Sequence, residues 1–490
     1  MGEAKAKTKL WKARQVLSRP MSRARFNLLA IGTRLSPIWM MAEEISYWSD
    51  DLERVIGVVL RDRTDNDYSW SLLARDKIGR FRSVEVDVSL RTADLAAGAL
   101  RERIAVAIAI DVGEFAALGD QADETNYPVD LLIPPAGTDR TKLHPYFRVL
   151  IEDPGRAPAR AVFKEIGPWL ALSDPHFVQE FQFNQFDQRL WELYLSATFR
   201  ELGFDIRQPE APDFLCSAPG IAFTVEATTV APSTSGPLAN HPDPHTLEEM
   251  EYFLTHYMPM KFASSLTSKL NKKNKEGESY WERGETAGKP FVLAIADFHI
   301  PGDAGNVGSM TYTQSALWPY LYGRRMGWKI VDGKLEVSTM RGSDHVFAGK
   351  SVPTGFFDLP GSENVSAVLF SNAGTLAKFD RMGVAAGFAA PQHRYLRFGL
   401  KFNSDPNSVM GVPFSVEVDA PSYHEAWSDE LQLFHNPNAK YPLARRIFPG
   451  VTQHYFEDGA PITLARADTI LGSRTIILRI VDSDQEVTEV

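Results

Sequence analysis

Residues 186–202 read FDQRLWELYLSATFREL, and residues 203–228 continue as GFDIRQPEAPDFLCSAPGIAFTVEAT. The first segment predicts a helix that is apolar around almost its whole circumference, which is typical of a buried helix. Glu192 lies in the middle of this segment. A buried carboxylate is costly unless it is paired or bound to a cation, so Glu192 is a candidate functional residue. The alternative is a structural pair with Arg189 or Gln188.

The second segment predicts two strands joined by a turn at residues 217–220, where Pro and Gly follow Ser and Ala. In the returning strand, residues 221–229, apolar side chains alternate with a second set that includes Glu226 and Thr228. This second set is expected to point toward the hairpin partner that carries Asp213. Two carboxylates on adjacent strands repel each other without a cation, and oxygen ligands suit Mg²⁺ or Mn²⁺.

This order of elements and residues resembles the PD-(D/E)xK nuclease superfamily, which has the restriction-endonuclease-like fold. The resemblance covers about residues 185–300 and implies a mixed central sheet flanked by helices. It also implies Mg²⁺ or Mn²⁺ that activates water for hydrolysis of a phosphodiester bond. The family's helix carboxylate, hairpin aspartate and strand glutamate, which hold the metal, correspond to Glu192, Asp213 and Glu226.

One position departs from the family pattern, because this chain has Thr228 where the family has a lysine. Threonine cannot supply a positive charge to the attacking water. We expect a lysine from a helix predicted at residues 260–275, where Lys269, Lys272 and Lys273 share a face. Lys269 is the candidate catalytic residue because its apolar neighbours tie it to the core, and Lys272 and Lys273 are candidate nucleic-acid contacts. The alternative is a solvated basic face.

Composition limits the class of protein. The chain has 490 residues, of which 44% are hydrophobic and 23% charged, and it has one cysteine. These values exclude a disordered chain, a disulfide framework and a zinc site built from several thiolates. No apolar run is long enough to span a membrane, so we expect a cytoplasmic protein. The net charge of −10 argues against a general nucleic-acid coat, although residues 1–25 carry eight Lys or Arg and one Glu.

The chain divides into segments of different character. The part before residue 165 predicts an antiparallel meander of strands and a helix capped by Thr92. Its Asp62, Asp65 and Asp67 are expected to form a turn rather than a cation site. A Pro- and Gly-containing linker is expected at residues 152–160. The predicted divisions are a basic arm at 1–25, an N-terminal α+β domain at 26–165, a nuclease-like α/β domain at 170–375 and an irregular β-rich region at 376–490.

These observations predict a mixed α+β protein that acts as a metal-dependent nuclease, with DNA favoured over RNA and a role in defence or repair. Asp297 and His299 follow a predicted buried strand and are candidates for the rim of the site. The alternative is an inactive nuclease-fold module for binding or scaffolding. A third interpretation is a structural protein with a coincidental motif. A homodimer or a partner protein is left open.

Overall fold

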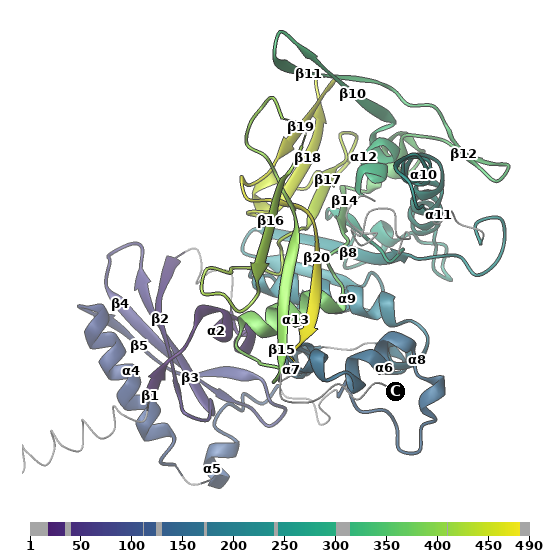
Figure 1. Ribbon diagram of the computed structural model, residues 1–490. Coiled ribbons are helices and arrows are strands. Elements are labelled where there is room, and N and C mark those ends of the chain that lie inside the picture. The colour runs from purple at the N-terminus through teal and green to yellow at the C-terminus, as the bar shows by residue number, and fades with distance from the viewer. Residues whose placement is uncertain are drawn as a thin grey trace, which may run out of the picture.

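The computed structural model describes residues 18–34, 41–110, 112–123, 130–170, 174–239, 244–299, 314–408 and 410–480. The fold is mixed α+β with several sheets. An N-terminal sheet lies to one side, a long central sheet has helices on both faces, and smaller sheets complete the molecule (Figure 1). The predicted mixed α+β class is therefore confirmed.

The N-terminal unit is an antiparallel meander packed on one long helix. Its sheet has the order β1-β2-β3-β4-β5. Leu100 and Ile104 of the helix pack against Trp70 of the sheet. The Thr92 side chain accepts a hydrogen bond from the Leu95 amide at the start of the helix, as the sequence predicts. These elements are β1 (Ser18–Pro20), β2 (Ala42–Asp50), β3 (Val55–Asp62), β4 (Tyr68–Arg75), β5 (Phe81–Leu90) and α4 (Ala93–Ala107).

The central sheet has eight strands in the order β19-β18-β17-β14-β9-β8-β7-β6. It is mixed: β8, β9 and β14 run parallel, whereas the β6-β7-β8 end and the β14-β17 pair are antiparallel. The strands are β6 (Asp205–Arg207), β7 (Phe214–Ala218), β8 (Ile221–Val230), β9 (Phe291–Asp297), β14 (Ala367–Ser371), β17 (Gln432–His435), β18 (Thr452–Glu457) and β19 (Ala460–Leu464).

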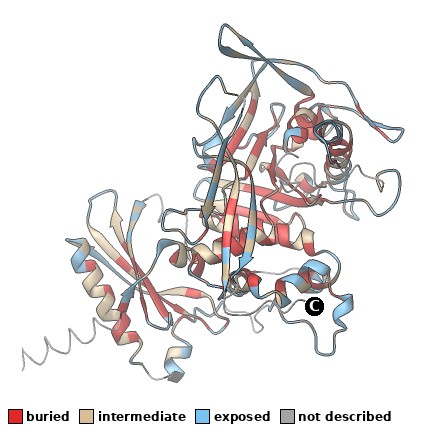
Figure 2. Cartoon of the chain, viewed as in Figure 1, coloured by how far each residue is buried: buried red, intermediate tan, exposed pale blue. Residues whose placement is uncertain are grey.

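Helices bury both faces of this sheet, and the alternation along β8 decides which residue faces which layer. Val225 and Ala227 share one apolar cluster with α7 (Ala157–Ile166), α9 (Phe186–Glu201) and α13 (Leu376–Ala385). Leu293, the register partner of Glu226, lies in the other cluster with α11 (Met258–Leu270) and α12 (Gln314–Tyr322). The sheet interior is accordingly buried, as the red strands of Figure 2 show. Glu226 therefore faces the α11 layer, as its period-two pattern predicts.

The remaining elements surround these layers. Strands β15 (His393–Lys401), β16 (Val412–Glu417) and β20 (Ile470–Arg479) form a three-stranded sheet, and β10 (Arg324–Val331) and β11 (Lys334–Arg341) form an exposed hairpin (Figure 2). Strands β12 (His345–Phe347) and β13 (Lys350–Val352) pair with each other. The other helices are α2 (Arg23–Leu29), α5 (Val112–Ala116), α6 (Pro145–Glu152), α8 (Phe177–Phe183) and α10 (Leu247–Tyr252). A π-helical turn at Phe253–Tyr257 joins α10 to α11.

The tertiary structure crosses several expected divisions. Strands β17, β18 and β19 extend the central sheet, so the sheet continues past the boundary expected at residue 375. The prediction of a linker at residues 152–160 is wrong, because a 3-10 turn at Pro154–Arg156 leads directly into α7. Proline is tolerated in the first turn of a helix, so Pro154 and Pro158 do not interrupt these elements.

The expected basic arm is also shorter than residues 1–25. Its residues 18–25 belong to the N-terminal unit, because β1 pairs with β2 and the Arg25 side chain contacts Glu53. Residues 1–17 lie outside the described residues.

Candidate metal and nucleic-acid site

Asp213 and Glu226 meet where β7 and β8 leave their shared ladder. The register pairs Phe214 with Val225, so one further step brings Asp213 opposite Glu226. Asp213 Oδ2 accepts a hydrogen bond of 2.6 Å from the Ala227 backbone amide, which holds this carboxylate next to Glu226. Glu226 is buried, with 4% of its surface exposed. The structure therefore brings these two sequence-predicted residues together at one end of the hairpin.

The electrostatics of Asp213 reflect this proximity. Burial raises the pKa of Asp213 well above its usual range, and the charges of Glu226 and then Glu192 raise it further. Lys269 and the Ala227 amide act in the opposite direction. Both its burial and its like-charged neighbours thus disfavour the ionised form of Asp213 when no positive charge is added.

Glu192 approaches this cluster from α9, on the opposite face of the sheet from α11. It is 4% exposed. Arg189 Nη1 and Gln188 Nε2 each donate to one of its carboxylate oxygens at 2.9 Å, so the structural pairing that the sequence left open is present. Burial raises the pKa of Glu192, and the charge of Glu226 adds to this rise while Arg189 opposes it. Glu192 is therefore paired and also within electrostatic reach of Glu226.

Lys269 reaches Glu226 from α11. Its Nζ lies 2.5 Å from Glu226 Oε1, and its side chain is 21% exposed. The same oxygen accepts a hydrogen bond of 2.7 Å from the hydroxyl of Tyr280. Burial raises the pKa of Tyr280, and the charge of Glu226 raises it further. Tyr280 is a site residue that sequence reasoning missed, since it lies in a polar segment after the helix without a periodic pattern.

Lys272 and Lys273 do not share the face of Lys269, and that prediction is wrong. Helix α11 ends at Leu270, so both residues lie beyond it and are exposed. Beyond the helix, Asn274 Oδ1 accepts the Glu278 amide at 2.8 Å, so residues 274–278 form a turn in place of the helix end expected at residue 275. Lys272 Nζ still lies 5.8 Å from the centre of the Tyr280 ring.

The donor set of this cluster suits a hard divalent cation. Glu192, Asp213 and Glu226 supply carboxylate oxygens, whereas Lys269 offers one positive charge to them. Arg189 is shared among Glu192, Asp174 and Glu180, whose Oε2 accepts from Arg189 Nε at 2.9 Å. The negative charge therefore exceeds the positive charge around Asp213, and this excess adds to burial, the larger cause, in raising the pKa of that carboxyl. Mg²⁺ and Mn²⁺ take oxygen ligands of this kind together with water.

A different acidic group is more compact. Among the described residues, only Asp62, Asp65 and Asp67 bring their ligand oxygens within 4.8 Å of one another, so the three carboxylates around Glu226 are spread more widely. The compact group lies in the turn between β3 and β4. There Asp62 Oδ1 accepts the Thr64 amide at 2.6 Å, and Asp65 Oδ1 accepts the Asp67 amide at 3.2 Å. These bonds are the turn chemistry that the sequence predicts.

Asp297 and His299 lie beyond Glu226, at and after the carboxyl end of β9. Asp297 pairs in register with Val230, four residues beyond Glu226 along β8, which corresponds to about 13 Å of strand. Asp297 Oδ1 contacts His299 Nδ1 at 2.7 Å, and His299 Nε2 lies 3.2 Å from the Tyr257 hydroxyl. Both residues are almost fully buried. They therefore form a separate buried group beyond the carboxylate cluster.

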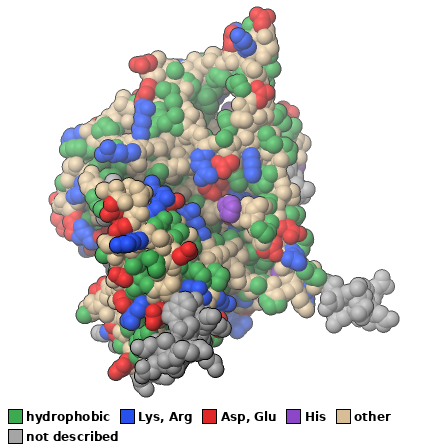
Figure 3. Space-filling view, turned by 90° about the vertical axis from the view of Figure 1, so that its left-hand side faces the viewer, with side chains coloured by type: hydrophobic (Ala, Val, Ile, Leu, Met, Phe, Trp, Pro, Cys, Tyr) green, Lys and Arg blue, Asp and Glu red, His purple; other side chains and the backbone are tan. Residues whose placement is uncertain are grey.

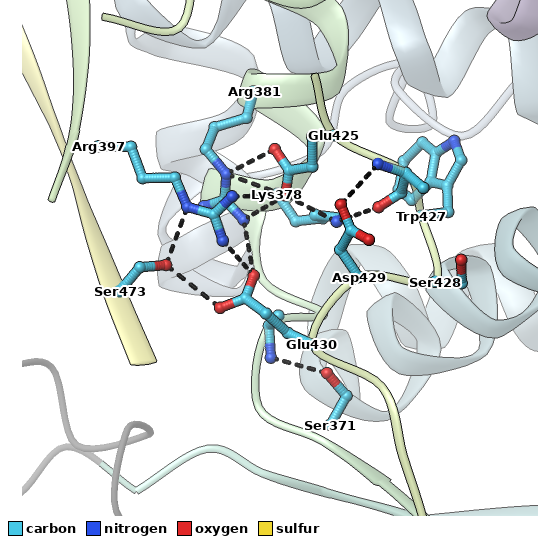
Figure 4. Close-up of polar contacts among 12 residues, drawn as sticks. Ser371, Lys378, Arg381, Arg397, Glu425, Trp427, Ser428, Asp429, Glu430 and Ser473 are labelled. Atoms are coloured by element: carbon cyan, nitrogen blue, oxygen red, sulfur yellow. Dashed lines mark hydrogen bonds and ion pairs between the residues drawn. The ribbon is translucent and has the colours of Figure 1, made fainter. Parts of the chain in front are cut away.

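A buried ionic network in another part of the described structure was also missed from the sequence (Figure 4). Lys378 and Arg381 of α13 contact Glu425 Oε1 at 2.7 and 2.9 Å, and Arg397 of β15 reaches the same oxygen at 3.3 Å. Arg397 also contacts Glu430. Burial alone would raise the pKa of Glu425, but Arg381, Arg397 and Lys378 outweigh it and hold that pKa well below its usual range. The cations and carboxylates satisfy one another, so this network ties α13 to the β15 sheet.

Comparisons with protein-family models, with curated proteins and with solved structures found no match for this chain. The function must therefore be argued from the geometry of the chain itself. Within the part of the chain that the structure describes, no helix combines the length and the apolar character needed to cross a membrane.

Proposed function

We propose that this protein is a divalent-metal-dependent nuclease that hydrolyses phosphodiester bonds in nucleic acid, with DNA favoured over RNA. The observation that carries the proposal is the contact between Lys269 Nζ and Glu226 Oε1 at 2.5 Å, beside Asp213. This contact places a positive charge beside β8, in which Thr228 stands where the family has a lysine. A role in defence or repair and a cytoplasmic location stay predictions.

Each side chain then has a definite role. Asp213 and Glu226 would hold Mg²⁺ or Mn²⁺, and Glu192 would bind it or orient a water ligand. A divalent cation at this position lowers the pKa of bound water and neutralises charge on the phosphate. Lys269 would place its ammonium beside the attacking water and the developing phosphate charge. The Tyr280 hydroxyl would keep the Glu226 carboxylate in its orientation.

The arrangement of elements supports a restriction-endonuclease-like core. A buried helix, α9, precedes the β6-β7-β8 antiparallel strands, and α11 follows before β9 returns parallel to β8. The two helices lie on opposite faces of the sheet. This is the order that the resemblance implies for residues 185–300.

The alternative function is an inactive nuclease-fold module that binds nucleic acid or acts as a scaffold. Two observations favour it. Thr228 Oγ1 lies 2.7 Å from Ser265 Oγ, so the Thr228 side chain packs against α11. Glu192 already has two hydrogen-bonding partners in the protein, Arg189 and Gln188.

Cleavage of plasmid DNA and of RNA by the purified protein tests both functions. We expect products with Mg²⁺ or Mn²⁺ and none with EDTA, and Glu226→Gln should abolish them. Cleavage that persists in Glu226→Gln at the wild-type rate would show that another site or a contaminant is responsible. If the wild type is inactive, Thr228→Lys decides: restored cleavage identifies a degenerate nuclease, and inactivity with retained binding supports the module.

A further inference from the structure

An open groove borders the carboxylate cluster on the α11 face of the central sheet. It has a volume of about 510 Å³ and is formed by the end of β8, the segment that follows it and α11. Of its thirteen described lining residues, eight are Ser or Thr, two are Lys and none is acidic. We call it the hydroxyl groove.

The groove is continuous with the candidate site through Lys269. This residue lines the groove and also contacts Glu226. Lys261, the second lysine, lies eight residues earlier in the same helix, which corresponds to about 12 Å along its axis. Ser264 and Ser268 lie between them, are exposed, and are spaced at i and i+4 on one helix face. The groove thus extends from the cluster as a row of hydrogen-bond donors.

Lys261 contacts the segment that follows β8. Its Nζ contacts Ser233 Oγ at 2.6 Å, and its side chain is partly buried. Burial lowers the pKa of Lys261, and the charge of Asp297 opposes this effect. A positioned ammonium in a groove without acidic lining favours an anion as its ligand.

We propose that the hydroxyl groove binds the phosphodiester backbone of the nucleic-acid strand next to the cleaved bond, with Lys261 as its cationic contact. This inference rests on the proposed function for the identity of the ligand. Ser, Thr and Lys side chains and backbone amides are the groups that contact phosphate oxygens in nucleic-acid complexes. The distance from Lys269 to Lys261 spans more than one phosphate, since one strand of duplex DNA carries a charge every ~3.4 Å of helix axis.

The charge distribution favours this local contact over a broad basic surface. The face shown in Figure 3 carries basic and acidic side chains interspersed with one another. The whole chain has a net charge of −10. Attraction to a polyanion must therefore come from a defined groove, and the lining of the hydroxyl groove contains two lysines and no carboxylate. Lys269 is paired with Glu226, which leaves Lys261, whose contact is with the Ser233 hydroxyl, as the cationic contact for a phosphate.

The test measures binding separately from cleavage. Fluorescence anisotropy of a labelled 20-base-pair DNA duplex, in EDTA and over a series of KCl concentrations, gives the affinity and its salt dependence. Lys261→Ala should weaken binding roughly tenfold at low salt, because one charge-assisted contact is lost. It should also reduce the slope of log K against log salt by about 0.9. Lys261→Arg, which keeps the charge, should retain most of the affinity.

Lys164→Ala is the matched control. Lys164 is an exposed lysine on α7, which packs on the opposite face of the central sheet. Its loss should leave affinity within twofold of the wild type.

Five outcomes decide the proposal. Equal binding by wild type and Lys261→Ala overturns it, as does a wild type that binds no duplex. Weaker binding with an unchanged salt slope also overturns it, since Lys261 then makes no phosphate contact. If Lys261→Ala shows the predicted defect while the wild type cleaves nothing in Mg²⁺, the groove is supported and the nuclease function fails. If the wild type cleaves but Lys261→Ala binds normally, the groove proposal fails alone.

Discussion

Lys269 Nζ lies 2.5 Å from Glu226 Oε1, although the two residues are 43 positions apart in the chain. The contact joins α11 to β8 across one layer of the core. It places an ammonium on the sheet face to which Glu226 and Thr228 point. The positive charge beside Glu226 therefore comes from a lysine of α11 and not from β8 itself.

If Lys269 stabilises transition-state charge, Lys269→Ala should lower the cleavage rate by about 10²-fold or more. The measurement is the single-turnover rate on plasmid DNA at saturating Mg²⁺. Lys275→Ala is the control, because Lys275 is exposed and lies beyond the end of α11. A loss of only a few-fold in Lys269→Ala, in a protein that cleaves, would mean that the lysine has no catalytic role.

Mg²⁺ or Mn²⁺ should raise the Tm of the wild type, because a ligand that binds only the native state stabilises it. At a concentration 100 times Kd the gain is about 2.7 kcal/mol. Glu226→Gln should remove this shift. Asp65→Asn, in the compact surface group, should retain it. The opposite pattern, with the shift lost in Asp65→Asn and kept in Glu226→Gln, would place the cation in the β3–β4 turn.

Asp213 should make the metal-free protein less stable as the pH rises. Its folded-state pKa is raised by burial and by Glu226. Above the unfolded-state pKa, the unfolded chain loses this proton first, so the free energy of unfolding falls with pH until Asp213 also ionises in the folded state. Asp213→Asn keeps an oxygen for the Ala227 amide and removes the titration.

In EDTA at pH 8, the Tm of Asp213→Asn should therefore exceed that of the wild type. A gain of about 1 kcal/mol would correspond to roughly 2–4 °C for a domain of 150–250 residues. With Mg²⁺ the order should reverse, because only the wild type gains the cation. A lower Tm for Asp213→Asn in EDTA would contradict the cluster of like charges.

Glu425→Gln should destabilise the fold by about 3–5 kcal/mol, because it leaves Lys378, Arg381 and Arg397 buried without a full countercharge. The folded-state pKa of Glu425 is depressed, so its contribution is present above the unfolded-state pKa and is lost as the pH falls below it. Urea denaturation at pH 7 and at pH 4 measures both effects. Glu417→Gln, at an exposed position on β16, should change stability by less than about 0.5 kcal/mol.

The sequence by itself determined the local elements around the candidate site. The apolar circumference of α9 and the period of two in β8 fix which residues are buried and which face each takes, because both depend only on backbone geometry. The same alternation predicted that Glu226 and Thr228 share one face. Proline-containing segments were less predictable, since Pro154 and Pro158 are compatible with both a linker and the first turn of a helix.

Only the tertiary structure decided which distant groups meet. The sequence predicts that Lys269 supplies a positive charge to the site, but no pattern in the chain indicates that Tyr280 shares Glu226 Oε1 with it. The same holds for β17, β18 and β19, which join the central sheet through strand pairing across long intervals of sequence. Local patterns specify turns and faces, whereas contacts between distant segments depend on how several buried layers pack at once. The buried ionic network around Glu425 could not be predicted from the sequence, because its charged residues come from α13, β15 and the 423–430 segment.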